Sequence, residues 1–116
     1  MQNFHPVGVC PIRDILSRIS SKWSMLVLAT LYANGTLRFN NIQKSIGDIS
    51  QRMLVVTLKS LEADGLVSRR VYPEVPPRVE YKLTERALSL IPLLNGLVDW
   101  ALANGNGIME HWERSR

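Results

Sequence analysis

The stretch SQRMLVVTLKSLEADG, which starts at Ser50, constrains the fold most, because both of its ends carry helix-capping signals. Ser50 is a good N-cap, since its hydroxyl can accept a backbone N–H of the first turn. Gly65 stands where helices commonly end with a left-handed residue. Leu54, Leu58 and Leu61 are spaced to share one face. The stretch is therefore predicted to be one helix that buries its leucines.

The opposite face of this helix carries an unusual mixture of side chains. Arg52, Val56 and Lys59 lie there, with Gln51 at the margin. A helix in a DNA major groove needs such a mixture, because Arg bonds guanine, Gln bonds adenine, apolar groups meet thymine methyls and Lys neutralises phosphate. The alternative is an amphipathic helix whose valines pack against another part of the fold.

The preceding segment supports the DNA interpretation. A short helix is predicted from Phe39 to Ile46, and Gly47 ends it three residues before Ser50. A short helix, a tight turn that starts with glycine and a second helix with a polar face form the helix-turn-helix arrangement.

Two further helices are predicted upstream. Cys10-Pro11 opens the first, with proline at N1. Its apolar stripe consists of Ile12, Ile15, Leu16 and Ile19. The second runs from about Lys22 to Ala33, and we expect it to be the buried central helix because it is apolar almost all round. Residues 36–38 have room for a small strand only.

A hairpin is predicted after the capped helix. Strands run from Leu66 to Tyr72 and over residues 79–83, with alternating apolar and polar side chains. The prolines between them cannot continue a ladder, so they form a stiff tip with Arg78 at its base. A hairpin directly after a recognition-type helix is the wing of a winged helix-turn-helix.

The last long helix is predicted to begin after the cap Thr84, to kink at Pro92 and to end near Asn104. Its apolar residues cover more than one face, which indicates a subunit interface. The candidate interface residues are Leu90, Leu93, Leu94, Leu97, Trp100 and Ala101. The alternative is a helix wedged in its own core. Residues 105–107 (GNG) should break the chain, and residues 108–112 could then form a short helix at the same interface.

The length of 116 residues predicts one domain. We expect a flexible arm over residues 1–9, a DNA-binding and dimerisation domain over 10–104, and a tail over 105–116. Twelve basic and seven acidic residues lie between Arg13 and Arg86, so the positive charge accompanies the predicted DNA-binding elements.

Several classes of protein are disfavoured. No uninterrupted apolar run reaches bilayer length, the N-terminus is not a secretory signal, and the single cysteine fits a reducing compartment, so we expect a cytoplasmic protein without a membrane partner. His5 and His111 lack companion ligands, so no metal is expected. The absence of a nucleophile–base pattern or phosphate loop predicts no cofactor and no enzyme.

Six motifs resemble the HxlR family of bacterial winged helix-turn-helix transcription regulators. They are Cys10-Pro11, Lys22-Trp23, Arg38-Phe39, ISQRML at 49–54, LEADGL at 61–66 and YPEVPPRVEY at 72–81. The resemblance covers residues 10–100. It implies a mainly α fold with a small β-hairpin (α+β), a homodimer through the terminal helices, and two recognition helices in successive major grooves. It also implies that some members sense oxidants or electrophiles through the cysteine at the position of Cys10.

The chemistry of Cys10 allows this role. A helix N-terminus favours the thiolate, and Arg13 and His5 could add to the effect. With one cysteine in the chain, oxidation would give an intersubunit disulfide, a mixed disulfide with a small thiol, or a sulfenic acid. The alternative is an unreactive structural thiol.

The chain is thus predicted to be a sequence-specific DNA-binding transcriptional repressor that reads a pseudo-palindromic operator. The predicted major-groove residues are Ser50, Gln51, Arg52, Val56 and Lys59. Arg78 is predicted to enter the minor groove or grip phosphate beside it, and Arg38 and Asn40 to contact phosphates. Two alternatives stay open, namely regulation by a small molecule in an apolar space between the terminal and second helices, and a winged helix that binds only proteins.

Overall fold

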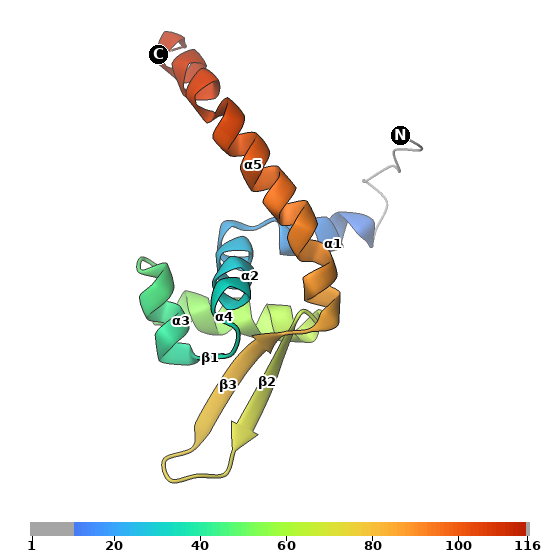
Figure 1. Cartoon of the computed structure of the whole chain (residues 1–116), viewed down its shortest axis with the longest axis vertical. Helices are drawn as coiled ribbons and strands as arrows, with labels where there is room; N and C mark the ends of the chain where they lie inside the picture. Colours follow the sequence, from blue (N-terminus) through green and yellow to red (C-terminus); the bar gives the residue numbers. More distant parts are fainter. Residues whose placement is uncertain (1–10, 116) are drawn as a thin grey trace.

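The computed structural model describes residues 11–115, which form five helices and a three-stranded antiparallel sheet. In chain order these are α1 (Ile12–Ile19), α2 (Lys22–Asn34), β1 (Leu37–Arg38), α3 (Phe39–Ile46), α4 (Gln51–Ala63), β2 (Val67–Tyr72), β3 (Arg78–Leu83) and α5 (Glu85–Arg114). The β2–β3 hairpin projects from the helical body at one end, and α5 leads away from it at the other (Figure 1). This order confirms the predicted winged helix-turn-helix.

Both ends of α4 are formed as predicted. The Ser50 hydroxyl accepts the N–H of Met53 at 3.0 Å. Gly65 has a φ of 76°, and the N–H of Leu66 donates to the Leu61 carbonyl at 2.9 Å. This bond, with that from the Gly65 N–H to the Glu62 carbonyl, is the Schellman ending of a helix. The chain therefore leaves α4 in a fixed direction, directly into β2.

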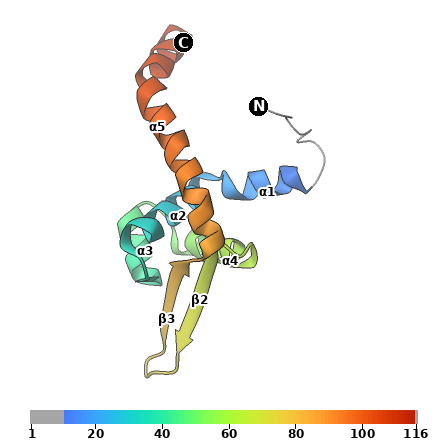
Figure 2. The same cartoon turned by 45° about the vertical axis from the view of Figure 1, so that its right-hand side comes forward.

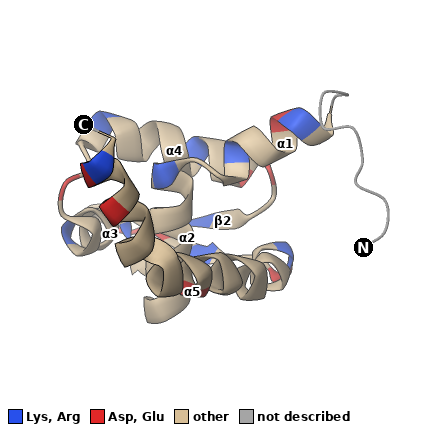
Figure 3. Cartoon of the chain, turned by 90° about the horizontal axis from the view of Figure 1, so that it is seen from above, with Lys and Arg blue, Asp and Glu red and all other residues tan. Residues whose placement is uncertain are grey.

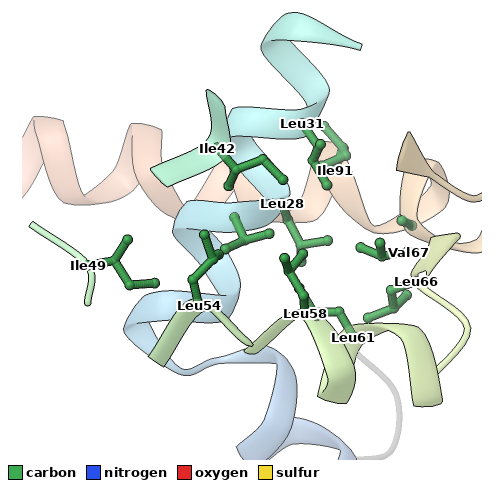
Figure 4. Close-up of a cluster of buried hydrophobic side chains, with 12 residues drawn as sticks. Leu28, Leu31, Ile42, Ile49, Leu54, Leu58, Leu61, Leu66, Val67 and Ile91 are labelled. Carbon is green, nitrogen blue, oxygen red and sulfur yellow. The ribbon is translucent and has the colours of Figure 1, made fainter. Parts of the chain in front are cut away.

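The core lies where α2 crosses α4. Side chains from α2, α3, α4, β2 and α5 converge there, and Figure 4 shows them directed toward one another. The fully buried large side chains are Val27, Leu28, Leu31, Ile42, Leu54, Leu61 and Val67. The prediction that α2 is the buried central helix holds for the side that carries Val27, Leu28 and Leu31 but is wrong for the other side, where Leu26 and Tyr32 are 38% and 55% exposed. Helices α3, α4 and α5 and strand β3 contact the rest of α2 and leave that side open.

The sheet has the strand order β1-β3-β2. In the hairpin Val67 pairs with Leu83 and Tyr72 with Arg78, which confirms the predicted wing. Strand β1 adds a third strand, with Arg38 opposite Glu80. Since side chains alternate between faces, the face of β2 that carries the buried Val67 also carries Arg69.

The helix α5 begins in the core and then leaves it. The Thr84 hydroxyl accepts the N–H of Ala87 at 3.2 Å, and Ala87 and Ile91 are buried. Pro92 lies within α5 and does not end it, and its predicted kink stays a prediction. The C-terminal part of α5 stands clear of the body (Figure 2).

The predicted chain break at residues 105–107 is wrong, because α5 continues through them to Arg114. A helical glycine costs only about 1 kcal/mol relative to alanine, which the hydrogen bonds of a continuing helix offset. Residues 105–115 are therefore not a separate tail with its own short helix. They extend the long helix, so that Ile108 and Trp112 lie seven and eleven residues beyond Ala101, on the same side.

The sequence has no uninterrupted apolar run of bilayer length, but the helix α5 as a whole is long and apolar enough to reach that length. Among the described residues, α5 is the one helix that is long and apolar enough, by length and composition, to cross a membrane, and only 11% of its most apolar 18-residue stretch is buried. A bilayer would have to take up Asp99, at a cost of about 2.5–3.5 kcal/mol near its centre, besides Asn95 and Asn104. Because the first turns of α5 are also fixed in the core, a protein partner suits the exposed apolar surface of α5 better than a bilayer does.

Two glycine substitutions test the end of α4 and the continuity of α5. Gly65→Ala should destabilise the fold by about 1–2 kcal/mol, because the left-handed backbone disfavours a Cβ. That Cβ would also lie 2.6 Å from Nη1 of Arg86. Gly107→Ala should instead stabilise it by about 0.4–1 kcal/mol, since no atom outside its own helix lies within 4 Å of the new Cβ. Urea unfolding measures both, and a Gly107→Ala variant less stable than the wild type would contradict a continuous α5.

Candidate nucleic-acid interface

The outer face of α4, formed by Arg52, Val56 and Lys59, stands free in the structure. All three residues are exposed, and Val56 is 55% exposed. The opposite face is buried through Leu54 and Leu58. Val56 therefore does not pack against another part of the fold, as the alternative interpretation of this helix would require. Among the described residues neither Arg52 nor Lys59 forms an ion pair, so both charges are available to a partner.

The turn before α4 fixes how its first residues are presented. Gly47 has a φ of 92°, and its N–H donates to the Gln43 carbonyl at 2.9 Å. The Gln43 amide donates to the carbonyl of Ile49, whose side chain is buried. Ser50 and Gln51 follow and are exposed. The structure thus brings these two residues and Arg52 together at the open N-terminal end of α4.

The predicted phosphate contacts lie at the start of α3. Arg38 is the last residue of β1 and the N-cap position of α3, and Asn40 lies in the first turn. Both side chains are exposed. The two residues belong to the same helix-turn-helix unit as α4, as predicted from their order in the sequence.

Arg78 is held by its own hairpin. Its Nη2 lies 3.3 Å from Oε2 of Glu74, and its Nε lies 3.4 Å from Oε2 of Glu80. The guanidinium also stacks over the Tyr72 ring, with its carbon 3.9 Å from the ring centre. The Nε is buried and makes no hydrogen bond, so its contact with Glu80 is an ion pair alone. Arg78, which we predicted to contact DNA, therefore already contacts two carboxylates and an aromatic ring of its own hairpin.

Two exposed cations on β2, Arg69 and Arg70, were not among the site residues predicted from the sequence. Arg69 and Arg70 are neighbours and point to opposite faces of the sheet. Arg70 lies with its guanidinium carbon 4.9 Å from the Tyr72 ring centre. Arg69 lines a hollow of about 350 Å³ together with Lys59 of α4. Strand alternation was the signal that could have found them, because one of two adjacent arginines must face α4.

Lys and Arg segments recur along α1, α4 and β2, whereas most of α5 carries no charge (Figure 3). One of these cations is engaged. Arg18 of α1 contacts Asp64 with Nε–Oδ distances of 2.9 Å and an Nη2–Oδ1 distance of 2.8 Å. The hydrogen bond and the charge of Asp64 raise the pKa of Arg18 above its ordinary value. This pair joins α1 to the end of α4.

The predicted interface residues of α5 divide into two groups. Leu90 and Leu94 are half-buried and pack against the protein's own core. Leu93, Leu97 and Trp100 are 70%, 52% and 58% exposed. Ala101 is exposed as well. On α1, Ile12, Ile15 and Leu16 are between 45% and 49% exposed. Two apolar helix surfaces thus lie uncovered in a single chain.

Two hollows bear on the small-molecule alternative. The space between α2 and α5, where we expected an apolar pocket, holds a hollow of about 260 Å³ that Lys82 and Thr36 also line. A larger hollow of about 430 Å³ lies between α1 and α5. Within residues 11–115 no group of three His, Cys, Asp or Glu side chains could hold a metal ion. Cys10 and the predicted arm over residues 1–9 lie outside the described residues.

Known proteins share this architecture. The HxlR-like helix-turn-helix family model matches residues 18–109. An HTH-type transcriptional regulator of Methanothermobacter thermautotrophicus is 49% identical over 98 residues, which are 84% of this chain and 74% of that protein. The solved structure of the regulator ytfH from Salmonella typhimurium has a TM-score of 0.80 at 36% identity, over 94% of this chain and 95% of that chain. The redox regulator HypR in its oxidized form has a TM-score of 0.72 at 40% identity, over 82% and 97%.

The match spans every element from the end of α1 into the last turns of α5, including the helix-turn-helix and the wing. The relatives are named as HTH-type transcriptional regulators. The family and the geometry of α4 agree on DNA as the partner. The chain belongs to the HxlR-like helix-turn-helix family of DNA-binding transcription regulators.

Proposed function

We propose that the protein is a cytoplasmic, homodimeric, sequence-specific repressor whose two α4 helices enter successive major grooves of a pseudo-palindromic operator. The observation that carries the proposal is the free outer face of α4 on a helix whose other face is buried. A two-fold dimer would repeat this face at half-sites about one helical turn apart. Repression follows where such a dimer occupies DNA that a polymerase needs.

The residues divide by role. Gln51, Arg52 and Val56 face base edges, because their side chains match adenine, guanine and thymine methyl groups. Ser50, whose hydroxyl oxygen is engaged as the α4 cap, can still donate its proton to a phosphate. Lys59 contributes charge, and Arg38 and Asn40 hold phosphates beside α3. These backbone contacts fix the register in which the bases are read.

The apolar surface of α5 supports the dimer. Leu93, Leu97 and Trp100 repeat every three to four residues along the exposed part of the helix, and Ile108 and Trp112 continue the stripe. An uncovered apolar stripe of this length is typical of a subunit interface. Ile15 of α1 lines a hollow together with Leu90 and Leu93 of α5, so the half-exposed stripe of α1 would enlarge that interface.

Arg52→Ala should weaken binding to the cognate duplex by about 1–3 kcal/mol and reduce its preference over random DNA, because a base contact is lost. Titration of a duplex selected from a random pool by the wild type, beside a random duplex, measures both effects. Arg114→Ala, which removes the same charge at the far end of α5, is the control. If Arg52→Ala binds both duplexes as the wild type does, its assigned role is wrong.

Leu97→Asp should convert the dimer to a monomer at micromolar concentration, because it places a charge in the proposed apolar interface. Asn95→Asp adds the same charge about 200° away around the helix and should leave the dimer intact. Sedimentation equilibrium gives the mass of each. A wild-type protein that is monomeric, or a dimeric Leu97→Asp variant, would contradict the interface.

The signal is proposed to be an oxidant or electrophile that reacts with Cys10. Support comes from the position of Cys10, two residues before the first residue of α1, and from the similarity to HypR, which is named a redox regulator. A thiolate close to a helix N-terminus is the reactive form. Since the chain has one cysteine, a disulfide would need the partner subunit or a small thiol.

Cys10→Ser should retain DNA binding and lose its response to a peroxide or quinone, because a serine hydroxyl can form neither a thiolate nor the disulfide or sulfenic acid that follows from its oxidation. A gel shift with and without the oxidant measures both. Induction retained in Cys10→Ser would point instead to a small-molecule ligand, for which the 430 Å³ hollow between α1 and α5 offers more apolar surface than the hollow at α2.

A further inference from the structure

The hollow between α4 and the hairpin lies between the two elements that face DNA. Its walls are Val55 and Lys59 of α4 and Arg69 of β2, and Phe39 and Tyr81 also line it. It has a volume of about 350 Å³ and is open to solvent. In the described part of the chain neither Lys59 nor Arg69 has a carboxylate within ion-pair distance. Two uncompensated cations of different elements thus share one opening.

The geometry of duplex DNA determines what crosses this opening, and here the argument rests on the proposed function. A helix in the major groove and a hairpin at the adjacent minor groove lie on either side of one sugar–phosphate strand. That strand must pass over the space between α4 and the hairpin. It carries one negative charge per nucleotide, and cations facing it release its counterions. The hollow is therefore the place where α4 and β2 meet the same strand.

Arg78 is not the hairpin cation that faces the DNA strand over this hollow. Its charge is offset by Glu74 and Glu80, at 3.3 and 3.4 Å, and its side chain is stacked on Tyr72. These contacts lie on the face of the hairpin that carries Arg70 and Glu80, which are paired in the ladder. Arg69 is on the other face, beside α4. The free cation of the wing that points toward the recognition helix is thus Arg69.

We propose that Lys59 and Arg69 form a clamp for one backbone phosphate of the strand that separates the two grooves. Arg69 comes from the wing and Lys59 from the recognition helix, so the phosphate joins the two elements. Glu62 also lines the hollow, one turn beyond Lys59, and its carboxylate disfavours a phosphate directly beside it. The clamp adds affinity without sequence preference, because a phosphate is the same at every base pair.

The test is the salt dependence of binding to two duplexes, one selected from a random pool by the wild type and one of random sequence. Arg69→Ala should make the negative slope of log K against log salt shallower by about one and weaken binding to both duplexes by the same factor. Arg69→Lys, which keeps the charge, should restore most of the wild-type slope. Lys59→Ala should make the slope shallower in the same way.

Arg70→Ala is the matched control, because it removes the neighbouring charge from the opposite face of the hairpin. It should leave the slope unchanged, and circular dichroism should show that all variants are folded. A folded Arg69→Ala variant with the wild-type slope overturns the clamp, as does an equal loss of slope in Arg70→Ala. A wild type that enriches no duplex from the random pool, or binds the enriched duplex no better than random DNA, would instead count against the proposed function.

Discussion

The packing of the α4 leucines against α2 is the contact on which the rest of the structure depends. Leu54, Leu58 and Leu61 are almost completely buried, and each such side chain contributes about 1.5–3 kcal/mol. Because a helix is rigid, burying this face turns Arg52, Val56 and Lys59 outward. The ending at Gly65 then directs the chain into β2, and the Thr84 hydroxyl donates back to the Gly65 carbonyl at 2.6 Å. The recognition helix, the wing and α5 are thereby fixed relative to one another.

Local chemistry made α4 and the wing predictable from the sequence, since caps, a left-handed glycine and prolines act within a few residues. The errors arose where tertiary or helical context prevails. The glycines at 105 and 107 indicated a break, yet each costs only about 1 kcal/mol in a helix that continues on both sides. The partners of Arg78 depend on the shape of the hairpin tip, and the position of Arg69 beside Lys59 depends on how the sheet packs on α4. Neither follows from spacing alone.

The distribution of charge separates two kinds of arginine in the wing. Arg78 stabilises the hairpin through Glu74, Glu80 and Tyr72, whereas Arg69 is left uncompensated next to the recognition helix. A similar division holds along α5, where the first turns complete the core and the remainder presents an apolar stripe. The cationic face of α4 and the apolar stripe of α5 are therefore separate: α4 lies in the helical body beside the wing, whereas α5 leads away from that body (Figure 1).

The central claim is that two copies of the outer face of α4 read one DNA site across a two-fold axis. Hydroxyl-radical footprinting on the DNA flanking the protein's own gene tests it most directly. The account predicts two protected half-sites of related, inverted sequence, with centres about 10 base pairs apart. A single protected half-site, or protection that moves freely along the DNA without regard to sequence, would contradict it.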